Sequence, residues 1–488
     1  MIAANIGKIF LEAYNEKYKS NYSAKQFFVE KYFELFFNHE KYMQWVTNSP
    51  FVQGITTSDE GEYGIEIGKV KLGDEDKIKF SFNEAYSKYG EKRITRKTDN
   101  KKKIIKIILR NDEIQRTERL EELNNKANKN DADASIAIGF PSLDLIASTS
   151  GQITSMKLPL NEEDVYLSWI GGGFGVGVQS GLSLLFADKR ILLDLFEGWQ
   201  LYRDYLNKTP ELRGNQINTW NGQWLAHRYN KRTYTPANPT ALFDAFGTMK
   251  DGGMEINTQA WTKVLVGIAR TYPDTTLTAY VYSLGQTNIT VGFIPFELPR
   301  IRQPYELYEK YFNTTDSEKI EQIFGTAIGF TKACQMGAIG VNALEPKGFR
   351  DTFDKGVIPI YNPNDEEKKI NFNTYKIWLL SMLNNEQLWE QSQQIAITLS
   401  EYSKNKEKAN SPVQKSGAKT SKSREVDTLL TATNKKQFID GLSTIVDGSE
   451  TENVESLKEI AKSIHLMPID NVPYFLTLIR FQYAVINK

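Results

Sequence analysis

Apolar side chains near the start of the chain recur at the spacing of an amphipathic helix. The segment AKQFFVEKYFELFFNHEKYMQWV, residues 24–46, places large apolar side chains near one face at intervals of three or four residues. They are Phe28, Tyr32, Leu35, Phe36 and Met43. We therefore expect residues 2–52 to be mostly helical, with this face turned toward a core.

The period changes to two from residue 63 onward. Apolar and polar residues alternate through KVKL and KIKFSF on either side of the polar turn GDED, which predicts a β-hairpin within residues 63–82. Residues 92–110 hold nine Lys or Arg against one acid, Asp99, and end in KKKIIKIILR. This pattern predicts a hairpin arm with cations at its tip, among them Lys101, Lys102 and Lys103. A polar helix or linker follows.

The rest of the chain combines both periods. Helical segments such as 189–206 and 258–271 alternate with apolar, glycine-rich runs. TTLTAYVYSLGQTNITVGFIPFEL has the β-branched and aromatic content of two strands joined at residues 285–288. From about residue 364 the pattern is helical. It is interrupted by a Lys-, Ser-, Asn- and Gly-rich insert, residues 403–425, which favours a mobile loop.

These patterns predict an α+β fold. A mixed N-terminal body with small antiparallel sheets and helices is followed by an all-α C-terminal helical bundle. A chain of 488 residues exceeds the size of one core, so we expect three domains. Residues 1–135 form an N-terminal helical segment with the basic hairpin region, 136–363 a mixed α/β body, and 364–488 the helical bundle with its insert.

Composition narrows the class of protein. Sixty Lys and Arg balance 60 Asp and Glu, so a polyanion would have to bind at local patches. One cysteine, Cys334, excludes an intramolecular disulfide framework and is typical of a reducing compartment. The start is amphipathic rather than a signal peptide, and no apolar run crosses a bilayer without charges. We therefore expect a cytoplasmic protein with no membrane partner.

One stretch without any carboxylate, residues 212–243, departs from this balance. Its centre, NQINTWNGQWLAHRYNKRTY, combines two tryptophans, six side-chain amides and four basic or imidazole side chains. Aromatic rings stack on bases, amides read base edges and cations bind phosphate, so the composition favours a nucleic-acid groove. The other interpretation is a buried tryptophan pair beside an ordinary basic loop.

Each residue type in this stretch has an expected role. Trp220 and Trp224 stack on bases or wedge between them. Side-chain amides read duplex edges, and cations bind phosphate. The amides are Asn218, Asn221 and Gln223, and the cations are Arg228, Lys231 and Arg232. Further phosphate contacts are expected from the lysines at 101–103 and from Arg300 and Arg302 in ELPRIRQPYELYEKY.

Catalytic, cofactor and metal sites find little support in the sequence. WIGGGFGVGVQSG, residues 169–181, fails the dinucleotide, phosphate-loop and nucleophile-elbow patterns, and a turn where two backbones or a nucleic-acid strand approach closely is the better interpretation. Three scattered histidines and one cysteine cannot form the usual zinc sites. The stretch DEDKIK, which contains Glu75, matches only a short part of a nuclease motif. We therefore expect no catalytic residues, no cofactor and no metal.

The layout resembles the large subunit of a type I CRISPR surveillance complex (Cascade), close to the type I-B branch. The resemblance rests on KYMQWVTNSPFVQG (41–54), INTWNGQWL (217–225) and TAYVYSLGQTNITVGF (278–293), and on a mixed body followed by a helical domain with a Lys-rich insert. It implies a non-catalytic subunit that contacts guide RNA, recognises the motif flanking the DNA target and starts strand separation. One departure is that this chain lacks the cysteines of a zinc module that some relatives carry.

The resemblance also implies partners. They are guide RNA, double- and single-stranded target DNA, other CRISPR backbone subunits and a helicase-nuclease. It makes an internal start at Met382 plausible, giving a small helical second product; alternatively Met382 is an ordinary core methionine. The competing class is a catalytic antiviral defence protein, either a metal-dependent nuclease or a nucleotide-dependent enzyme using glycine-rich residues 171–181. A scaffold whose basic patches bind acidic proteins is a third option.

Overall fold

The chain folds into two compact units in a computed structural model. Unit 1 comprises Met1–Thr271 and Leu277–Pro295, and unit 2 comprises Tyr272–Thr276 and Phe296–Lys488. The structure describes residues 1–44, 46, 51, 55–57, 63–71, 93–99, 102–109, 113–129, 136–140, 154–156, 159–250, 252–273, 276–283, 289–313, 327–404, 421–447 and 451–488. The presence of small antiparallel sheets and a helical C-terminal region confirms the expected α+β class.

The helices of unit 1 are distributed along its sequence from residue 2 to residue 271. They are α1 (Ile2–Tyr18), α2 (Ala24–Phe27), α3 (Glu34–Phe36), α5 (Glu113–Ala127), α6 (Glu162–Gly172), α7 (Lys189–Lys208), α8 (Ile217–Arg228) and α9 (Trp261–Thr271). A π-helix, Phe28–Phe33, joins α2 to α3. The expected N-terminal helices are therefore confirmed as far as Phe36, after which the chain becomes irregular.

The contact between α1 and α6 depends on glycine. A Cβ on Gly7 would lie 2.0 Å from the Leu167 carbonyl oxygen, and a Cβ on Gly171 would lie 1.8 Å from the Ala3 carbonyl oxygen. Only a residue without a side chain lets two helix backbones approach so closely. The two helices therefore cross in direct backbone contact, and α1 buries Phe10 in an aromatic cluster.

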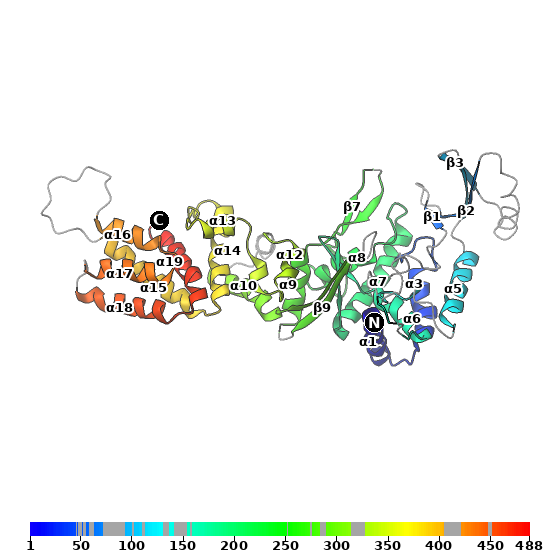
Figure 1. Ribbon diagram of the computed structural model, residues 1–488, viewed down its shortest axis with the longest axis horizontal. Helices are drawn as coiled ribbons and strands as arrows, with labels where there is room; N and C mark the ends of the chain where they lie inside the picture. The colour runs from blue at the N-terminus through cyan, green and yellow to red at the C-terminus, as the bar shows by residue number, and fades with distance from the viewer. Residues whose placement is uncertain are drawn as a thin grey trace. The chain divides into compact units, whose positions relative to one another are not determined.

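The described strands of unit 1 form three small sheets. The first has the strand order β1-β2-β4-β3, the second has the order β10-β9-β6-β5, and the third pairs β7 with β8. The strands are β1 (Ile55–Thr57), β2 (Tyr63–Lys71), β3 (Arg93–Asp99), β4 (Lys102–Leu109), β5 (Val176–Val178), β6 (Leu182–Phe186), β7 (Phe246–Thr248), β8 (Met254–Ile256), β9 (Leu277–Ser283) and β10 (Ile289–Phe296). Figure 1 shows the projecting hairpin of β7 and the strand β9 near α8 and α9.

The predicted basic hairpin arm is confirmed by the pairing of β3 with β4, whose register runs from Arg93↔Ile108 to Asp99↔Lys102. Strand β2 pairs with β1 and β4. The second half of the hairpin expected within residues 63–82 lies outside the described residues. The polar helix or linker expected after β4 is the helix α5.

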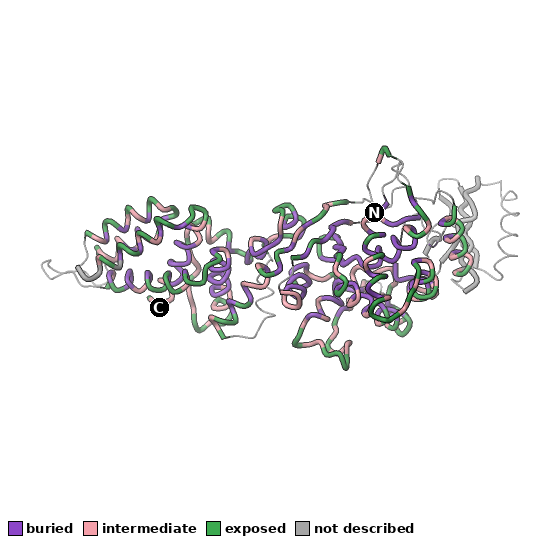
Figure 2. The backbone as a smooth tube through the Cα atoms, turned by 90° about the horizontal axis from the view of Figure 1, so that it is seen from below, coloured by how far each residue is buried: buried purple, intermediate pink, exposed green. Residues whose placement is uncertain are grey.

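Unit 2 is built mainly of helices. They are α10 (Leu298–Phe312), α12 (Phe330–Gln335), α13 (Phe349–Asp354), α14 (Glu366–Leu383), α15 (Gln387–Lys404), α16 (Ser421–Leu430), α17 (Lys435–Asp447), α18 (Thr451–Leu466) and α19 (Val472–Ile486), with 3-10 turns at Val341–Leu344 and Ile469–Asn471. Helix α19 packs against both α14 and α15 and is largely buried (Figure 2). None of the helices in the described ranges is both long and apolar enough to span a membrane.

The two units do not follow the expected boundaries at residues 135 and 363. Helix α1 packs along α6, and α10 packs along α14, so contacts cross both positions. The C-terminal bundle therefore takes in helices upstream of residue 364. The expected mobile insert, 403–425, is helical at both ends, because α15 reaches Lys404 and α16 begins at Ser421. Residues 405–420 of the insert lie outside the described residues.

Met382 lies in the last turn of α14. A product that starts there would lack nearly all of this helix. It would lose the contact between the Phe372 and Phe481 rings, whose centroids are 4.6 Å apart, and the face of α19 that α14 covers would be exposed. The arrangement is that of a continuous helix, as the alternative interpretation of Met382 expects.

Candidate nucleic-acid interface

Helix α8 carries the centre of the acid-free stretch and lies inside unit 1. Its start is fixed by the backbone N–H of Asn215, which donates to the Tyr42 carbonyl oxygen (2.7 Å), and by that of Ile217, which donates to Met43 (3.2 Å). Eight of the 12 residues of α8 are buried, and they include polar as well as apolar side chains. A helix enclosed in this way must satisfy its polar side chains within the protein.

Asn221 is the most enclosed amide of α8 and makes three hydrogen bonds. Its Nδ2 donates to the carbonyl oxygens of Gly173 (2.8 Å) and Gly175 (2.9 Å), and its Oδ1 accepts from Trp199 Nε1 (3.0 Å). The side chain is fully buried. Asn221 therefore joins α8 to α7 and to the glycine-rich segment after α6, and the expected base-reading role stays a prediction.

The other two amides of the stretch are also engaged within unit 1. Gln223 Nε2 donates to the Asn257 carbonyl oxygen (2.6 Å), and its Oε1 accepts from Gln259 Nε2 (2.9 Å). Asn218 Nδ2 donates to Ser183 Oγ (3.0 Å). Gln223 is buried and Asn218 is half-buried, so both amides contribute to the packing of unit 1, and the expectation that they read base edges stays a prediction.

The two tryptophans of α8 have no free ring face. Trp220 is fully buried, donates from Nε1 to the Gly198 carbonyl oxygen (2.9 Å) and stacks on Tyr202 with ring centroids 4.9 Å apart. Trp224 donates from Nε1 to the Asp194 carbonyl oxygen (2.7 Å). Both rings are therefore buried within unit 1, as the alternative of a buried tryptophan pair beside a basic loop expects, and the base-stacking role stays a prediction.

Arg228 ends α8 and is held by carboxylates of α7. Its Nη2 lies 3.1 Å from Asp194 Oδ1 and 3.6 Å from Glu197 Oε2, and its guanidinium lies 4.5 Å from the Tyr234 ring centroid. Two acids already neutralise this cation, and the ring covers one face of it. In this arrangement the Arg228 guanidinium is engaged by carboxylates, and the expectation that it binds phosphate stays a prediction.

Two cations of the acid-free stretch are exposed in the turn that follows α8. Arg232 donates its backbone N–H to Asn230 Oδ1 (3.1 Å), and Tyr234 donates its backbone N–H to the Asn230 carbonyl oxygen (2.9 Å), so the turn is ordered. The side chains of Lys231 and Arg232 are exposed and have no ion-pair partner among the described residues. These two side chains are available for phosphate, and no finding tests whether they bind it.

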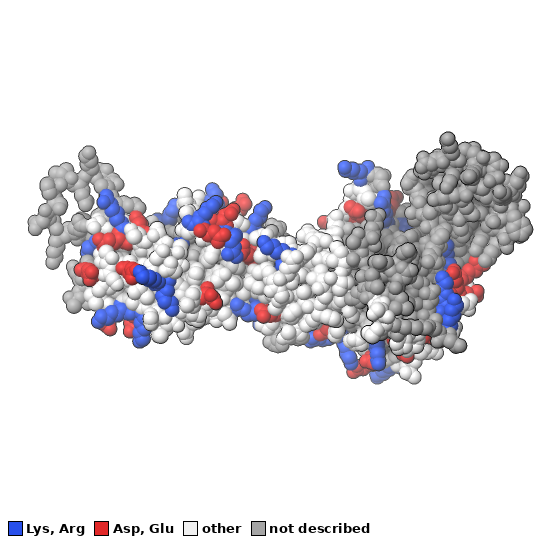
Figure 3. Space-filling model, in the orientation of Figure 1, with Lys and Arg blue, Asp and Glu red and all other residues white. Residues whose placement is uncertain are grey.

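A third exposed cation, Lys250, lies at the tip of the β7–β8 hairpin. Met254 in β8 donates its backbone N–H to the Glu211 carbonyl oxygen (2.9 Å) and accepts from the Arg213 N–H (3.0 Å). The hairpin is thus attached to the segment that begins the acid-free stretch. It projects from unit 1 in Figure 1, and Lys and Arg atoms lie at its tip in Figure 3.

The remaining expected phosphate contacts fall into two groups. In unit 2, Arg300 donates to the Ser381 carbonyl oxygen (2.8 Å), and burial lowers its pKa. Arg302 forms an ion pair with Glu306 one turn along α10 (3.0 Å). Both arginines therefore have partners within unit 2. Lys101 lies outside the described residues, and so do the side chains of Lys102 and Lys103 in β4.

The glycine-rich segment 171–181 is accounted for by close packing. A Cβ on Gly175 would lie 2.5 Å from the Tyr282 hydroxyl oxygen, and a Cβ on Gly177 would lie 3.0 Å from the backbone of Asn218. Gly222 on α8 faces the same segment, and a Cβ on Gly222 would lie 2.1 Å from the Gly177 carbonyl oxygen. The expectation of a turn where two backbones approach closely is confirmed.

Titratable groups do not gather into a metal site in the described part of the chain. No cluster of three or more His, Cys, Asp or Glu side chains is found there. Burial raises the pKa of the Cys334 thiol to about 11, so this thiol is protonated at neutral pH. His227 is buried and its ring Nε2 lies 2.9 Å from the Pro239 carbonyl oxygen. Burial lowers the pKa of His227, although this hydrogen bond partly opposes the shift.

Sequence reasoning missed two components of this surface. Lys250 was not selected, because strands of three residues show no measurable period; the only signal was the Gly-Gly pair at 252–253 in MKDGGME. Asp194 was not recognised as the partner of Arg228, from which it is 34 residues distant in sequence. No protein-family model, curated protein or solved structure matches this chain.

Proposed function

We propose that this chain is the non-catalytic, nucleic-acid-binding large subunit of a type I CRISPR interference complex. In this role it contacts guide RNA and recognises the motif that flanks the target in duplex DNA, which starts R-loop formation. Its partners are guide RNA, double- and single-stranded target DNA, the other backbone subunits and a helicase-nuclease. Its biological role is antiviral defence in the cytoplasm.

The observation that carries the proposal is that three exposed cations lie on two ordered turns of unit 1, the turn after α8 and the tip of the β7–β8 hairpin. Lys231, Arg232 and Lys250 have no ion-pair partner among the described residues, unlike Arg228. Cations left without carboxylates are the groups that phosphate contacts require.

The three stretches behind the resemblance support the same proposal. Described residues of all three stretches, 41–54, 217–225 and 278–293, are distant in sequence but contribute to the packing of unit 1, among them Tyr42, Trp220 and Tyr282. The backbone bonds of Tyr42 fix the start of α8, and Tyr282 of β9 and Asn218 of α8 approach Gly175 from two sides. A resemblance located in core segments is what a shared fold would produce, and it leaves the nucleic-acid contacts to the surface around that core.

The test compares two triple variants of the purified chain assembled with guide RNA. The first changes the proposed surface, Lys231→Ala, Arg232→Ala and Lys250→Ala. The matched control removes three exposed and equally unpaired cations of unit 2, Lys332→Ala, Lys347→Ala and Lys355→Ala. Binding to a labelled duplex is measured over a salt series. Each lost phosphate contact lowers the salt slope by roughly 0.9, so we expect the first variant to lose about 2–3 in slope and the control almost nothing.

Equal losses in both variants would indicate a non-specific charge effect and contradict the assignment of this surface. A second measurement concerns the flank itself. The assembled complex is challenged with targets that share one guide-complementary sequence but carry randomised flanks. We expect enrichment of a short motif, and uniform recovery of all flanks would overturn the large-subunit role.

The catalytic alternative has lost one of its two candidate sites. Tyr282 and Asn218 pack closely against Gly175, and the Asn218 backbone packs against Gly177, whereas residues 179–181 are exposed; no described observation favours a nucleotide at this segment. Glu75, the other candidate, lies outside the described residues. Incubating the chain with Mg²⁺ or Mn²⁺ and labelled DNA, with and without Glu75→Ala, tests this alternative directly: cleavage that the substitution abolishes would replace the binding proposal with a nuclease.

A further inference from the structure

The second sheet of unit 1 has one covered edge and one open edge. At the covered edge, Val178 of β5 forms a bridge with Gln259, and Gln179 donates its backbone N–H to the same residue (2.9 Å). At the other edge lies β10. From Ile289 to Pro295, the outer side of β10 has no backbone hydrogen-bond partner among the described residues. An unpaired strand edge is a template for another extended segment.

Strand β10 lacks the charges that normally protect an open edge. ITVGFIPF contains no charged residue, and Ile289 and Phe293 are 49% and 65% exposed. Natural edges usually carry lysines or inward-pointing charges that prevent pairing. Pro295 has no N–H to donate, so a ladder along this edge would end before it. The stretch available for pairing is Ile289–Ile294.

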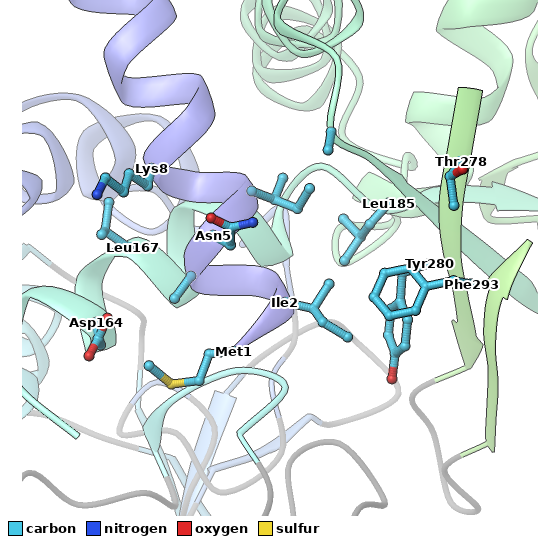
Figure 4. A pocket seen from close by; sticks show the side chains of 13 residues that line it. Met1, Ile2, Asn5, Lys8, Asp164, Leu167, Leu185, Thr278, Tyr280 and Phe293 are labelled. Atoms are coloured by element: carbon cyan, nitrogen blue, oxygen red, sulfur yellow. The ribbon is translucent and has the colours of Figure 1, made fainter. Parts of the chain in front are cut away.

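An apolar groove of about 510 Å³ adjoins this edge (Figure 4). Its floor is a row of side chains across the sheet: Leu185 of β6 lies opposite Tyr280 of β9, and the Tyr280 and Phe293 rings are 5.5 Å apart. Ile2 of α1 and Leu167 of α6 form its wall. Alternate side chains of a strand added beside β10 would extend the row that ends at Phe293 and enter this groove.

Two opposite charges stand at the wall of the groove, and each lacks a partner. Lys8 on α1 is exposed, and Asp164 on α6 is half-buried; neither forms an ion pair with any described residue. Figure 4 shows both side chains on the helical side, away from Phe293. An occupant that presents a carboxylate to Lys8 and a cation to Asp164 would complement both. A nucleic acid would not, since β10 carries no cation to bind its phosphates.

We infer that the β10 edge and its groove are a docking site for an extended apolar segment of another protein. The segment adds a fifth strand beside β10, inserts alternate apolar side chains between Phe293 and the α1–α6 wall, and pairs an acidic side chain with Lys8 and a basic one with Asp164. Backbone hydrogen bonds provide affinity and the groove provides side-chain selection. The inference does not depend on nucleic-acid binding and goes beyond the proposed function.

The test uses fluorescent peptides of alternating Val and Thr that carry one Glu and one Lys. We expect saturable binding to the wild-type chain, and at least a tenfold loss when the backbone amides on one edge of the peptide are N-methylated. Phe293→Ser should cause a similar loss while leaving thermal unfolding unchanged, because the ring is mostly exposed. A peptide in which Lys replaces the Glu should bind the wild type weakly and regain affinity for Lys8→Glu.

Several results would overturn the docking site. Binding that tolerates N-methylation would mean that no strand is added. The absence of binding by every peptide, or displacement of the peptide by RNA, would exclude an apolar protein segment as the occupant. A dimer of the chain that Phe293→Ser dissociates would assign the edge to a second copy of this chain instead. The peptide in which Lys replaces the Glu, measured with the wild type and with Lys8→Glu, decides whether Lys8 belongs to the site. If this peptide binds the wild type weakly and does not regain affinity for Lys8→Glu, Lys8 is not part of the site.

Discussion

Helix α8 and the turn after it belong to the same acid-free stretch but have opposite environments. In α8, eight of 12 residues are buried, and the amides bond to carbonyl oxygens of neighbouring segments. In the turn, Lys231 and Arg232 are exposed and unpaired among the described residues. The absence of carboxylates therefore has a different physical reason in each of the two regions. Amides inside the helix satisfy buried carbonyls without carrying charge, whereas cations outside it remain free for an anion.

Helix α7 explains why these regions differ. It presents the carbonyl oxygens of Asp194 and Gly198 to the two indole N–H groups of α8, and its Asp194 and Glu197 carboxylates neutralise Arg228. The contact between α7 and α8 ends at Arg228, the last residue of α8. The cations that follow, Lys231 and Arg232, lie beyond its carboxylates. The length of the contact between α7 and α8 therefore determines which residues of the stretch stabilise the fold and which remain exposed to an anion.

The largest effect is expected from Trp220→Ala. Removing a fully buried indole creates a cavity beside Tyr202 and should lower the free energy of unfolding of unit 1 by about 3–5 kcal/mol. The matched control, Lys231→Ala, removes an exposed side chain of the same stretch and should change stability by less than about 0.5 kcal/mol. Urea unfolding followed by circular dichroism measures both. A Trp220→Ala chain of normal stability that no longer binds nucleic acid would restore a stacking role.

The second effect concerns the amides. Asn221→Ala leaves two buried carbonyl oxygens and the Trp199 N–H without partners, so we expect a loss of about 2–4 kcal/mol in unfolding free energy. Asn238→Ala removes an exposed amide from the loop of the same stretch and should be nearly neutral. Binding by the folded Asn221→Ala chain should keep its flank preference, and a blurred preference at full stability would return Asn221 to base reading.

The comparison also shows how far the sequence alone could lead. The periodicity of residues 24–46 predicted helix correctly as far as Phe36, because apolar spacing is a local property of the chain, and it failed beyond Phe36, where the chain is irregular. Whether the side chains of Trp220 and Asn221 are buried or exposed could not be predicted in this way, since tryptophans and amides occur both in cores and in nucleic-acid grooves. What decides between these environments is α7, whose contacting residues lie some 20–30 positions earlier.

A smaller loss of stability is expected from a change at Arg228, which lies between the buried helix and the exposed turn. Arg228→Met removes the cation between Asp194 and Glu197 while Tyr229 still donates to Asp194 (2.8 Å), so we expect a loss of about 1–2 kcal/mol in stability. The salt slope of nucleic-acid binding should not change. Lys231→Met should do the reverse, lowering the slope by roughly 0.9 with no loss of stability. A reduced slope in Arg228→Met would place Arg228 on the binding surface.

The smallest effect involves His227, which connects the helix to the exposed loop through its contact with the Pro239 carbonyl oxygen (2.9 Å). Burial holds the pKa of His227 below its usual value, so a proton binds the unfolded chain more tightly than the folded one. The stability linked to this group is therefore complete above about pH 6.5 and is lost as the pH falls below that value. His227→Phe removes this titration, since Phe cannot bind a proton.

Urea midpoints of the wild type and His227→Phe, measured between about pH 5 and pH 8, test this link. We expect the wild-type midpoint to fall more steeply than that of the variant below about pH 6.5. His39, whose pKa burial, Arg203 and Arg116 lower to about 4 despite a backbone hydrogen bond, contributes the same sign to both proteins and cancels in the difference. Parallel profiles would mean that the ring titrates alike in both states, as an exposed histidine does. The contact to Pro239 would then not hold the loop, and Lys231 and Arg232 would depend on the Asn230 turn alone for their placement.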